Sequence, residues 1–167
     1  MNVLVNAILQ KIISYKDIPI LFNSQYRGNH KLVFTNGCFD MLHRGHIHLL
    51  ISAKNLGDNL IIGLNSDDSI RRLKGKTRPI IDEQTRSIIL ASLLFVDFVI
   101  LFNEDTPFEL IQLVKPDILI KGGDYRIEDI VGYDIVTATG GEVRTIPFLE
   151  GFSSSSLINK LKEKKVK

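Results

Sequence analysis

One stretch decides the fold of this 167-residue chain: Lys31-Leu32-Val33-Phe34-Thr35-Asn36-Gly37-Cys38-Phe39-Asp40-Met41-Leu42-His43-Arg44-Gly45-His46. The apolar run Leu32–Phe34 predicts a buried strand, and the turn at Asn36-Gly37 separates it from a helix expected to begin near Gly45. Free backbone N–H groups and the helix dipole point the same way at such a junction. The stretch therefore predicts an anion-binding site, with His43 and His46 beside it.

The overall composition is that of an ordinary globular protein, with 44% hydrophobic and 24% charged residues in what we expect to be one main domain. A net charge of +2 is too small to predict a nucleic-acid or membrane partner. The single cysteine, Cys38, excludes an internal disulfide and is typical of a reducing compartment. The apolar N-terminus lacks the basic segment and cleavage site of a secretory signal, so we expect a cytoplasmic protein.

Strands and helices alternate from residue 31 onward. Strands are predicted at 31–36, 60–64, 98–101, 118–120 and 142–146. Helices are predicted at 45–56, through Leu73 after a cap at Ser66 or Asp67, from Asp82, from Thr106-Pro107 to Val114, at 127–138 and at 153–164. Continuous apolar strands separated by helices predict a Rossmann-like α/β fold, with a five-stranded parallel sheet covered on both faces. Residues 1–30, with an amphipathic helix at 2–14, are expected to form an N-terminal helical extension to a domain of residues 31–167.

Polar or glycine-rich residues follow the successive predicted strands. They are Asn36–His46, Asn65–Asp68 and Lys121–Asp124, and Ser153–Ser156 open the last predicted helix. Ligands of parallel α/β sheets bind beyond the carboxyl ends of the strands, where these segments converge. The sequence therefore predicts a single ligand site at this edge of the sheet.

Three common sites do not fit the sequence. Gly75-Lys76-Thr77 resembles the end of a P-loop, but Ile70 stands where the first glycine is required. No Gly-x-Gly-x-x-Gly follows the first predicted strand of the sheet, which argues against a standard dinucleotide site. A structural zinc site would need a second cysteine or a different histidine spacing.

The residues Thr35–His46 resemble the signature of the cytidylyltransferase-like nucleotidyltransferases. Together with Lys121-Gly122-Gly123-Asp124-Tyr125, they are similar to the adenylyltransferase domain of the bacterial ADP-heptose pathway, and the likeness runs from about residue 31 to 161. The family's Ser-Thr-Thr is here Ser153-Ser154-Ser155, which keeps the hydroxyls. Residues 1–30 are far too few for the sugar kinase that many relatives carry as a fused domain.

The resemblance implies transfer of AMP from ATP to a sugar 1-phosphate, a heptose 1-phosphate, with release of pyrophosphate, for ADP-heptose and lipopolysaccharide core synthesis. It implies catalytic roles for His43 and His46 at the triphosphate and for Lys74 between the two phosphates. The expected nucleotide-binding residues are Thr35, Asn36, Gly37, Cys38, Phe39, Gly45, Lys121, Gly122, Asp124, Ser153, Ser154 and Ser155. The expected acceptor-binding residues are Asp40, Asn65, Asp67 and Arg78. Mg²⁺ is expected with ATP, held by phosphate oxygens and water rather than by a protein metal site.

Several alternatives stay open at this point. Arg86 is either a phosphate ligand or a solvated helix residue, and Asp40 either orients its loop or holds substrate. The same histidines would serve a cytidylyltransferase that uses CTP and glycerol 3-phosphate or a similar small phosphate. A non-catalytic nucleotide-binding domain is a third interpretation, which the histidines, Lys74 and the serine run argue against. The oligomeric state also stays open, and a homodimer is the commonest assembly of such proteins.

Overall fold

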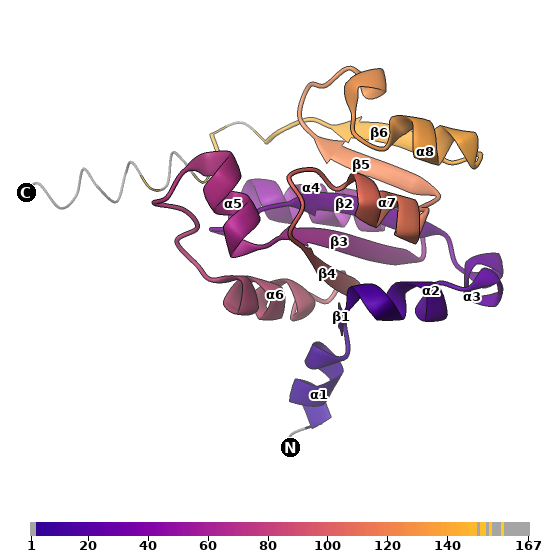
Figure 1. Cartoon of the computed structure of the whole chain (residues 1–167), viewed down its shortest axis with the longest axis horizontal. Coiled ribbons are helices and arrows are strands. Elements are labelled where there is room, and N and C mark those ends of the chain that lie inside the picture. Colours follow the sequence, from indigo (N-terminus) through magenta and orange to yellow (C-terminus); the bar gives the residue numbers. More distant parts are fainter. Residues whose placement is uncertain (1–2, 150, 153, 155–157, 159–167) are drawn as a thin grey trace, which may run out of the picture.

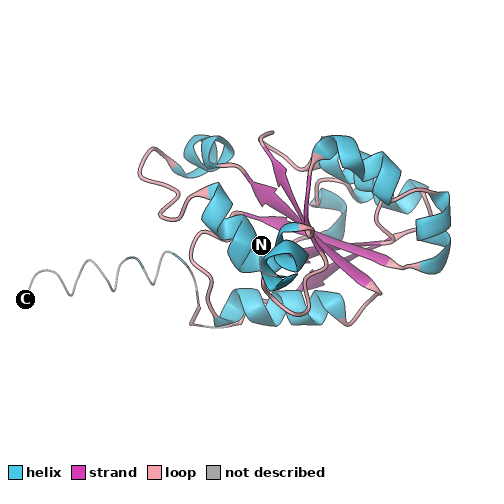
Figure 2. Cartoon of the chain, turned by 90° about the horizontal axis from the view of Figure 1, so that it is seen from below, coloured by secondary structure: helices cyan, strands magenta, loops and turns pink. Residues whose placement is uncertain are grey.

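The computed structural model contains one parallel sheet, and helices pack against both of its faces (Figures 1 and 2). The structure describes residues 3–149, 151, 152, 154 and 158. Over these residues the strands are β1 (Ile12–Ile13), β2 (Leu32–Gly37), β3 (Asn59–Asn65), β4 (Phe98–Phe102), β5 (Ile118–Gly122) and β6 (Glu142–Ile146). Their order is β1-β4-β3-β2-β5-β6, and every neighbouring pair is parallel. The predicted α/β class is confirmed, as are all five predicted strands.

Each face of the sheet buries its own apolar cluster. Successive side chains of a strand point to opposite faces, so Leu32 and Phe34 of β2 join one cluster while Val33 joins the other. The first cluster lies under α2 (Ile18–Leu21), α7 (Phe108–Val114) and α8 (Tyr133–Ala138). The second lies under α4 (Arg44–Lys54) and α6 (Glu83–Ala91). The remaining helices are α1 (Val3–Leu9), α3 (Ser24–Asn29), α5 (Asp67–Lys74) and the short 3-10 turns η1 (Tyr15–Asp17) and η2 (Ile127–Asp129).

Two helices beside the site, α5 and α6, begin at caps that the sequence predicts. Ser66 caps α5 by accepting a hydrogen bond from the Ser69 N–H at 3.0 Å, and Asp82 caps α6 by accepting from the Thr85 N–H at 2.9 Å. Helix α7 begins one residue later than predicted. Pro107 is its N-cap rather than its first residue, because its ψ of 13° lies outside the helical range.

The N-terminal helix prediction is wrong beyond Leu9. Helix α1 ends there, and Ile12–Ile13 form the sixth strand at the edge of the sheet, paired with Val99 and Ile100 of β4. An open strand edge provides backbone partners for β-branched residues, and this pairing overrides the helical spacing of the segment. The boundary predicted at residue 31 stays a prediction.

Two further helix predictions differ from the structure. The helix predicted at 127–138 is divided into η2 and α8, because Gly132 between them has a φ of 95°, which helical backbone does not allow. The helix predicted at 153–164 lies almost wholly outside the described residues. Within the described ranges, no helix has both the length and the apolar character needed to cross a membrane.

Candidate active site

Two adjoining cavities open at the carboxyl ends of the strands. The first cavity, of about 720 Å³, is lined by the start of α4, the ends of β5 and β6, and described residues between 147 and 154. The second cavity, of about 550 Å³, is lined by the ends of β2, β3 and β5 and by the segments that follow β4 and β5. The described residues that line both cavities are His46, Leu49, Lys74, Gly122 and Phe148. The predicted site is therefore divided into two compartments that share one wall.

His43 and His46 stack at the start of α4, with ring centroids 3.7 Å apart. His43 is the N-cap of the helix, and its Nδ1 accepts a hydrogen bond from the His46 N–H at 3.4 Å. That contact assigns the proton of a neutral His43 to Nε2. A Cβ on Gly45 would lie only 3.0 Å from the His43 Nδ1 and 3.3 Å from the Phe152 Cβ, so the glycine permits this close arrangement.

Both histidines are held in the neutral form. Burial lowers the pKa of His46 to about 4, the positive charges of His43 and Lys74 act in the same direction, and the Met41 backbone opposes them. Burial also lowers the pKa of His43. At neutral pH the two imidazoles are therefore hydrogen-bond donors without a formal charge, beside the N-terminus of a helix.

Lys74 provides a mobile positive charge at the junction of the cavities. It is the last residue of α5, it is exposed, and no carboxylate in the described part of the chain forms an ion pair with it. The next residue, Gly75, has a φ of 92° and turns the chain out of the helix. Lys74 can therefore reach an anion in either cavity.

Asp40 connects the turn after β2 to the loop between α5 and α6. Its Oδ2 lies 2.6 Å from Nε and 2.5 Å from Nη2 of Arg78, and its Oδ1 accepts from the N–H groups of Ile80 and Ile81 at 2.7 and 2.9 Å. The Asp40 side chain is almost fully buried, and it lines neither cavity. Both carboxylate oxygens are occupied, so the geometry favours the loop-orienting interpretation of Asp40.

Arg86 is buried, and the interpretation as a solvated helix residue is wrong. It donates to the carbonyls of Ile81, Cys38 and Asn65 at 2.9, 2.7 and 2.9 Å. Its Nη2 also lies 2.7 Å from the Asp67 carboxylate. Arg86 lines neither cavity, so it fixes the backbone at the ends of β2 and β3 from behind.

The structure sorts the predicted site residues into three groups. Those lining the first cavity are His43, Gly45, His46, Lys74, Arg78, Gly122 and Ser154. Those lining the second are Asn36, Gly37, Cys38, Phe39, His46, Asn65, Lys74, Lys121 and Gly122. Thr35, Asp40, Asp67 and Asp124 line neither, and Ser153 and Ser155 lie outside the described residues. The individual roles of these residues stay predictions.

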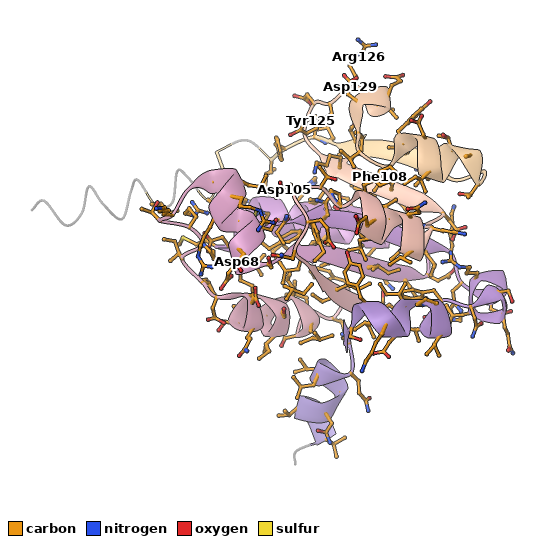
Figure 3. All side chains as sticks on the ribbon, in the orientation of Figure 1. Asp68, Asp105, Phe108, Tyr125, Arg126 and Asp129 are labelled. Carbon is orange, nitrogen blue, oxygen red and sulfur yellow. The ribbon has the colours of Figure 1, made fainter. Side chains whose placement is uncertain are left out.

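Sequence reasoning missed several residues that line the cavities. Phe148 borders both cavities and is 68% exposed. Asp105, Tyr125 and Asp129, which are labelled in Figure 3, line the second cavity. Phe148 follows the last strand, so the rule that located the other polar loops at strand ends would also have located it. Tyr125 directly follows the predicted segment Lys121–Asp124, so the same rule would have located it, whereas Asp129 lies further from the strand end and has no comparable signal.

A protein metal site is not apparent in the part of the chain that the structure describes. Its histidine, cysteine, aspartate and glutamate side chains form no group of three or more that could hold an ion. The presence of Mg²⁺ and the identity of its ligands stay predictions.

A parallel sheet whose central strand leads into a His-x-Gly-His helix start, with cavities at the strand ends, defines a nucleotidyltransferase. The chain belongs to the cytidylyltransferase-like family, whose sequence profile matches residues 34–160. It is 53% identical over 156 residues to the bifunctional protein HldE of Campylobacter jejuni, covering 93% of this chain and 32% of that protein. It is 52% identical over 149 residues to HldE of Helicobacter pylori, covering 88% of this chain and 31% of that protein. The chain thus spans about a third of the length of the curated relatives it matches.

One solved structure is a relative by sequence, and another shares the fold alone. The lipopolysaccharide core biosynthesis protein of Thermoplasma volcanium is 34% identical, covers 72% of this chain and 98% of its own, and gives a TM-score of 0.59. Pantoate-β-alanine ligase of Francisella tularensis gives a TM-score of 0.60 at 20% identity, with 91% of this chain and 77% of that chain covered, which shows a shared fold alone. The family resemblance and the nucleotidyltransferase class predicted from the sequence are both confirmed.

Proposed function

We propose that the chain transfers AMP from ATP to a heptose 1-phosphate and releases pyrophosphate, in the synthesis of ADP-heptose for the lipopolysaccharide core. The observation that carries this proposal is the meeting of two cavities at His46, Lys74 and Gly122. Transfer between two bound phosphates is favoured by adjoining sites that hold both reactants, and a cation at their boundary offsets the repulsion between the phosphates. The similarity to HldE proteins and to a lipopolysaccharide core biosynthesis protein supports a heptose as the acceptor.

The chemistry follows from the arrangement of charges. An oxygen of the acceptor phosphate attacks the α-phosphorus of ATP, a P–O bond forms there, and the bond to the β-phosphate oxygen breaks as pyrophosphate leaves. Neutral His43 and His46 donate hydrogen bonds to the nucleotide phosphates, and these bonds strengthen as negative charge builds on the oxygens. Lys74 neutralises charge on both phosphates and reduces their repulsion.

Mg²⁺ bound to the ATP phosphates would further neutralise their charge, with phosphate and water oxygens as its ligands. The acid–base groups of the site do not have to accept a proton for this reaction, because the acceptor phosphate is already an anion at neutral pH. Use of ATP as donor is consistent with the cytoplasmic location expected from the sequence. Positioning and electrostatic stabilisation therefore account for the catalysis that we propose.

Pyrophosphate release tests the proposal directly. We would supply the purified chain with ATP or CTP and with heptose 1-phosphate, glucose 1-phosphate or glycerol 3-phosphate. We expect pyrophosphate and an equal amount of ADP-heptose from ATP with heptose 1-phosphate. Turnover only with CTP and glycerol 3-phosphate would replace the proposal with the cytidylyltransferase alternative. Nucleotide binding without turnover of any pair would favour a regulatory domain.

A further inference from the structure

We propose that the second cavity is the acceptor site and that Lys121 binds the acceptor phosphate there. This inference rests on the proposed function and adds to it the residue that selects an anionic acceptor. It differs from the sequence interpretation, in which Lys121 and other residues of this cavity, Asn36–Phe39 and Gly122, contact the nucleotide.

The Lys121 side chain is a partly buried cation that forms no ion pair with another side chain of the described residues. Lys121 is next to the last residue of β5, and it lines the second cavity but not the first. Its Nζ donates a hydrogen bond to the Asn36 Oδ1 at 3.4 Å. Burial lowers its pKa, and the nearby Cys38 acts in the opposite direction. Burying an unpaired ammonium costs free energy, and an anionic ligand in the cavity would offset that cost.

The position of Lys121 points to the acceptor phosphate rather than to the triphosphate. The anion-binding features expected to hold the triphosphate, namely His43, Gly45 and Ser154, all line the first cavity. Lys74 lines both cavities, so it can bridge the two phosphates, whereas Lys121 can meet only a ligand in the second. The two lysines therefore have separable roles.

The rest of the second cavity suits a hydroxyl-rich molecule with one phosphate. It is lined by residues with amide, carboxylate and hydroxyl groups, namely Asn65, Asp105, Thr106, Tyr125 and Asp129. Carboxylates accept hydrogen bonds from sugar hydroxyls, and they repel a triphosphate. Asp105 also forms an ion pair with Arg72 at 2.7 Å, which holds this carboxylate at the cavity wall. Because Arg72 neutralises Asp105, Lys74 and Lys121 outweigh the remaining carboxylate, Asp129, and this excess of positive charge favours a phosphorylated sugar.

Steady-state kinetics of Lys121→Met separates the two ligands. With ATP saturating, we expect the KM for heptose 1-phosphate to rise at least about tenfold, because a charge-assisted hydrogen bond is lost. With heptose 1-phosphate saturating, the KM for ATP should stay within about twofold of wild type, a change below the energy of one hydrogen bond. Lys121→Arg should recover part of the acceptor affinity. Lys31→Met is the matched control, because Lys31 is exposed and lies just before β2. It is therefore at the amino ends of the strands, whereas the cavities are at the carboxyl ends.

A protection experiment on the wild-type chain keeps the inference testable if Lys121→Met does not fold. Lysine acylation is measured by mass spectrometry with heptose 1-phosphate, with ATP or with neither. We expect heptose 1-phosphate to protect Lys121 and ATP alone to leave it reactive. Protection by ATP alone, or a Lys121→Met variant in which only the KM for ATP rises, would overturn the inference.

The two proposals fail in different ways. A wild-type chain that uses glycerol 3-phosphate instead of heptose 1-phosphate overturns the proposed function, and Lys121→Met is then tested with that acceptor. A wild-type chain that is active with heptose 1-phosphate and unaffected by Lys121→Met overturns the inference alone. A chain that turns over no phosphorylated acceptor overturns both.

Discussion

The guanidinium of Arg86 lies 2.7 Å from the carboxylate of Asp67, and the Arg86 side chain is almost fully buried. The same side chain donates to the carbonyls of Cys38 and Asn65, at the ends of two neighbouring strands. One residue of α6 therefore fixes the backbone from which both cavities are built. Its role is to position the site, since it lines neither cavity.

Replacing Arg86 with Met should strongly destabilise the fold. The substitution leaves the Asp67 carboxylate and the three carbonyls without their donor, and removing one partner of a buried ion pair costs about 3–5 kcal/mol. Urea unfolding followed by circular dichroism measures the loss. Arg71→Met is the control, because Arg71 pairs with Asp68 on the exposed face of α5 and its loss should cost no more than about 1 kcal/mol. Equal stability of Arg86→Met and Arg71→Met would contradict the positioning role.

Replacing His46 with Ala should lower kcat by at least about 100-fold, because one preorganised donor to the developing charge is lost. The measurement is pyrophosphate release under saturating substrates, with the fold checked by circular dichroism. His48→Ala is the matched control, since His48 is exposed on the same helix and lines neither cavity. Near-normal turnover of His46→Ala would remove His46 from the catalytic residues.

The lowered pKa of His46 predicts a loss of stability in acid. The unfolded state protonates this imidazole near its ordinary pKa of about 6.5, whereas the folded state does so only at about 4. As the pH falls between these values, the unfolded state binds more protons, so the free energy of unfolding decreases. For this partly buried group we expect a decrease on the order of 2 kcal/mol.

The difference between wild type and His46→Asn isolates this contribution. The free energy of unfolding of both proteins is measured in urea at pH 7.5 and at pH 4.5. Relative to wild type, His46→Asn should be more stable at pH 4.5 than at pH 7.5. His48→Asn serves as the comparison, and it should follow wild type at both pH values. A constant difference between wild type and His46→Asn across this range would mean that the folded imidazole titrates normally.

Asp40→Asn should loosen the loop between α5 and α6 without unfolding the protein. The amide keeps one acceptor oxygen but loses the ion pair to Arg78 and part of the contact with the Ile80 and Ile81 N–H groups. Limited trypsin digestion should then cleave this loop at Lys74 or Lys76 faster than in wild type. Asp68→Asn, on the exposed face of α5, should digest at the wild-type rate. Unchanged digestion of Asp40→Asn would show that the pair does not hold the loop.

The sequence was sufficient for the features that depend on local pattern. Apolar runs such as Leu60–Leu64 predicted the strands, and Ser66 and Asp82 marked helix starts through their capping bonds. The strand Ile12–Ile13 was missed because its partner, Val99–Ile100, is far away in the chain and leaves no local signal. Pairing with a distant strand decides the structure of so short a segment.

The division of the site into two cavities was also beyond local reasoning. Lys121 and Gly122 are neighbours in sequence, yet Lys121 lines only the second cavity while Gly122 lines both. The burial of Arg86 depends on carbonyls of Cys38 and Asn65, which the fold places around it. Sequence pattern located the edge of the sheet that holds the site, and packing between distant segments determined which residues share a cavity.

Lys74 gives the sharpest contrast with Lys121, because it lines both cavities and Lys121 lines one. Replacing Lys74 with Met removes the charge shared by the two phosphates, so kcat should fall by about 100-fold or more. The KM values for ATP and for heptose 1-phosphate should then both rise. Lys76→Met is the control, because Lys76 is exposed two residues further along and lines neither cavity. A Lys74→Met variant that changes only the KM for heptose 1-phosphate would confine Lys74 to the acceptor site and leave the bridge between the phosphates to another group.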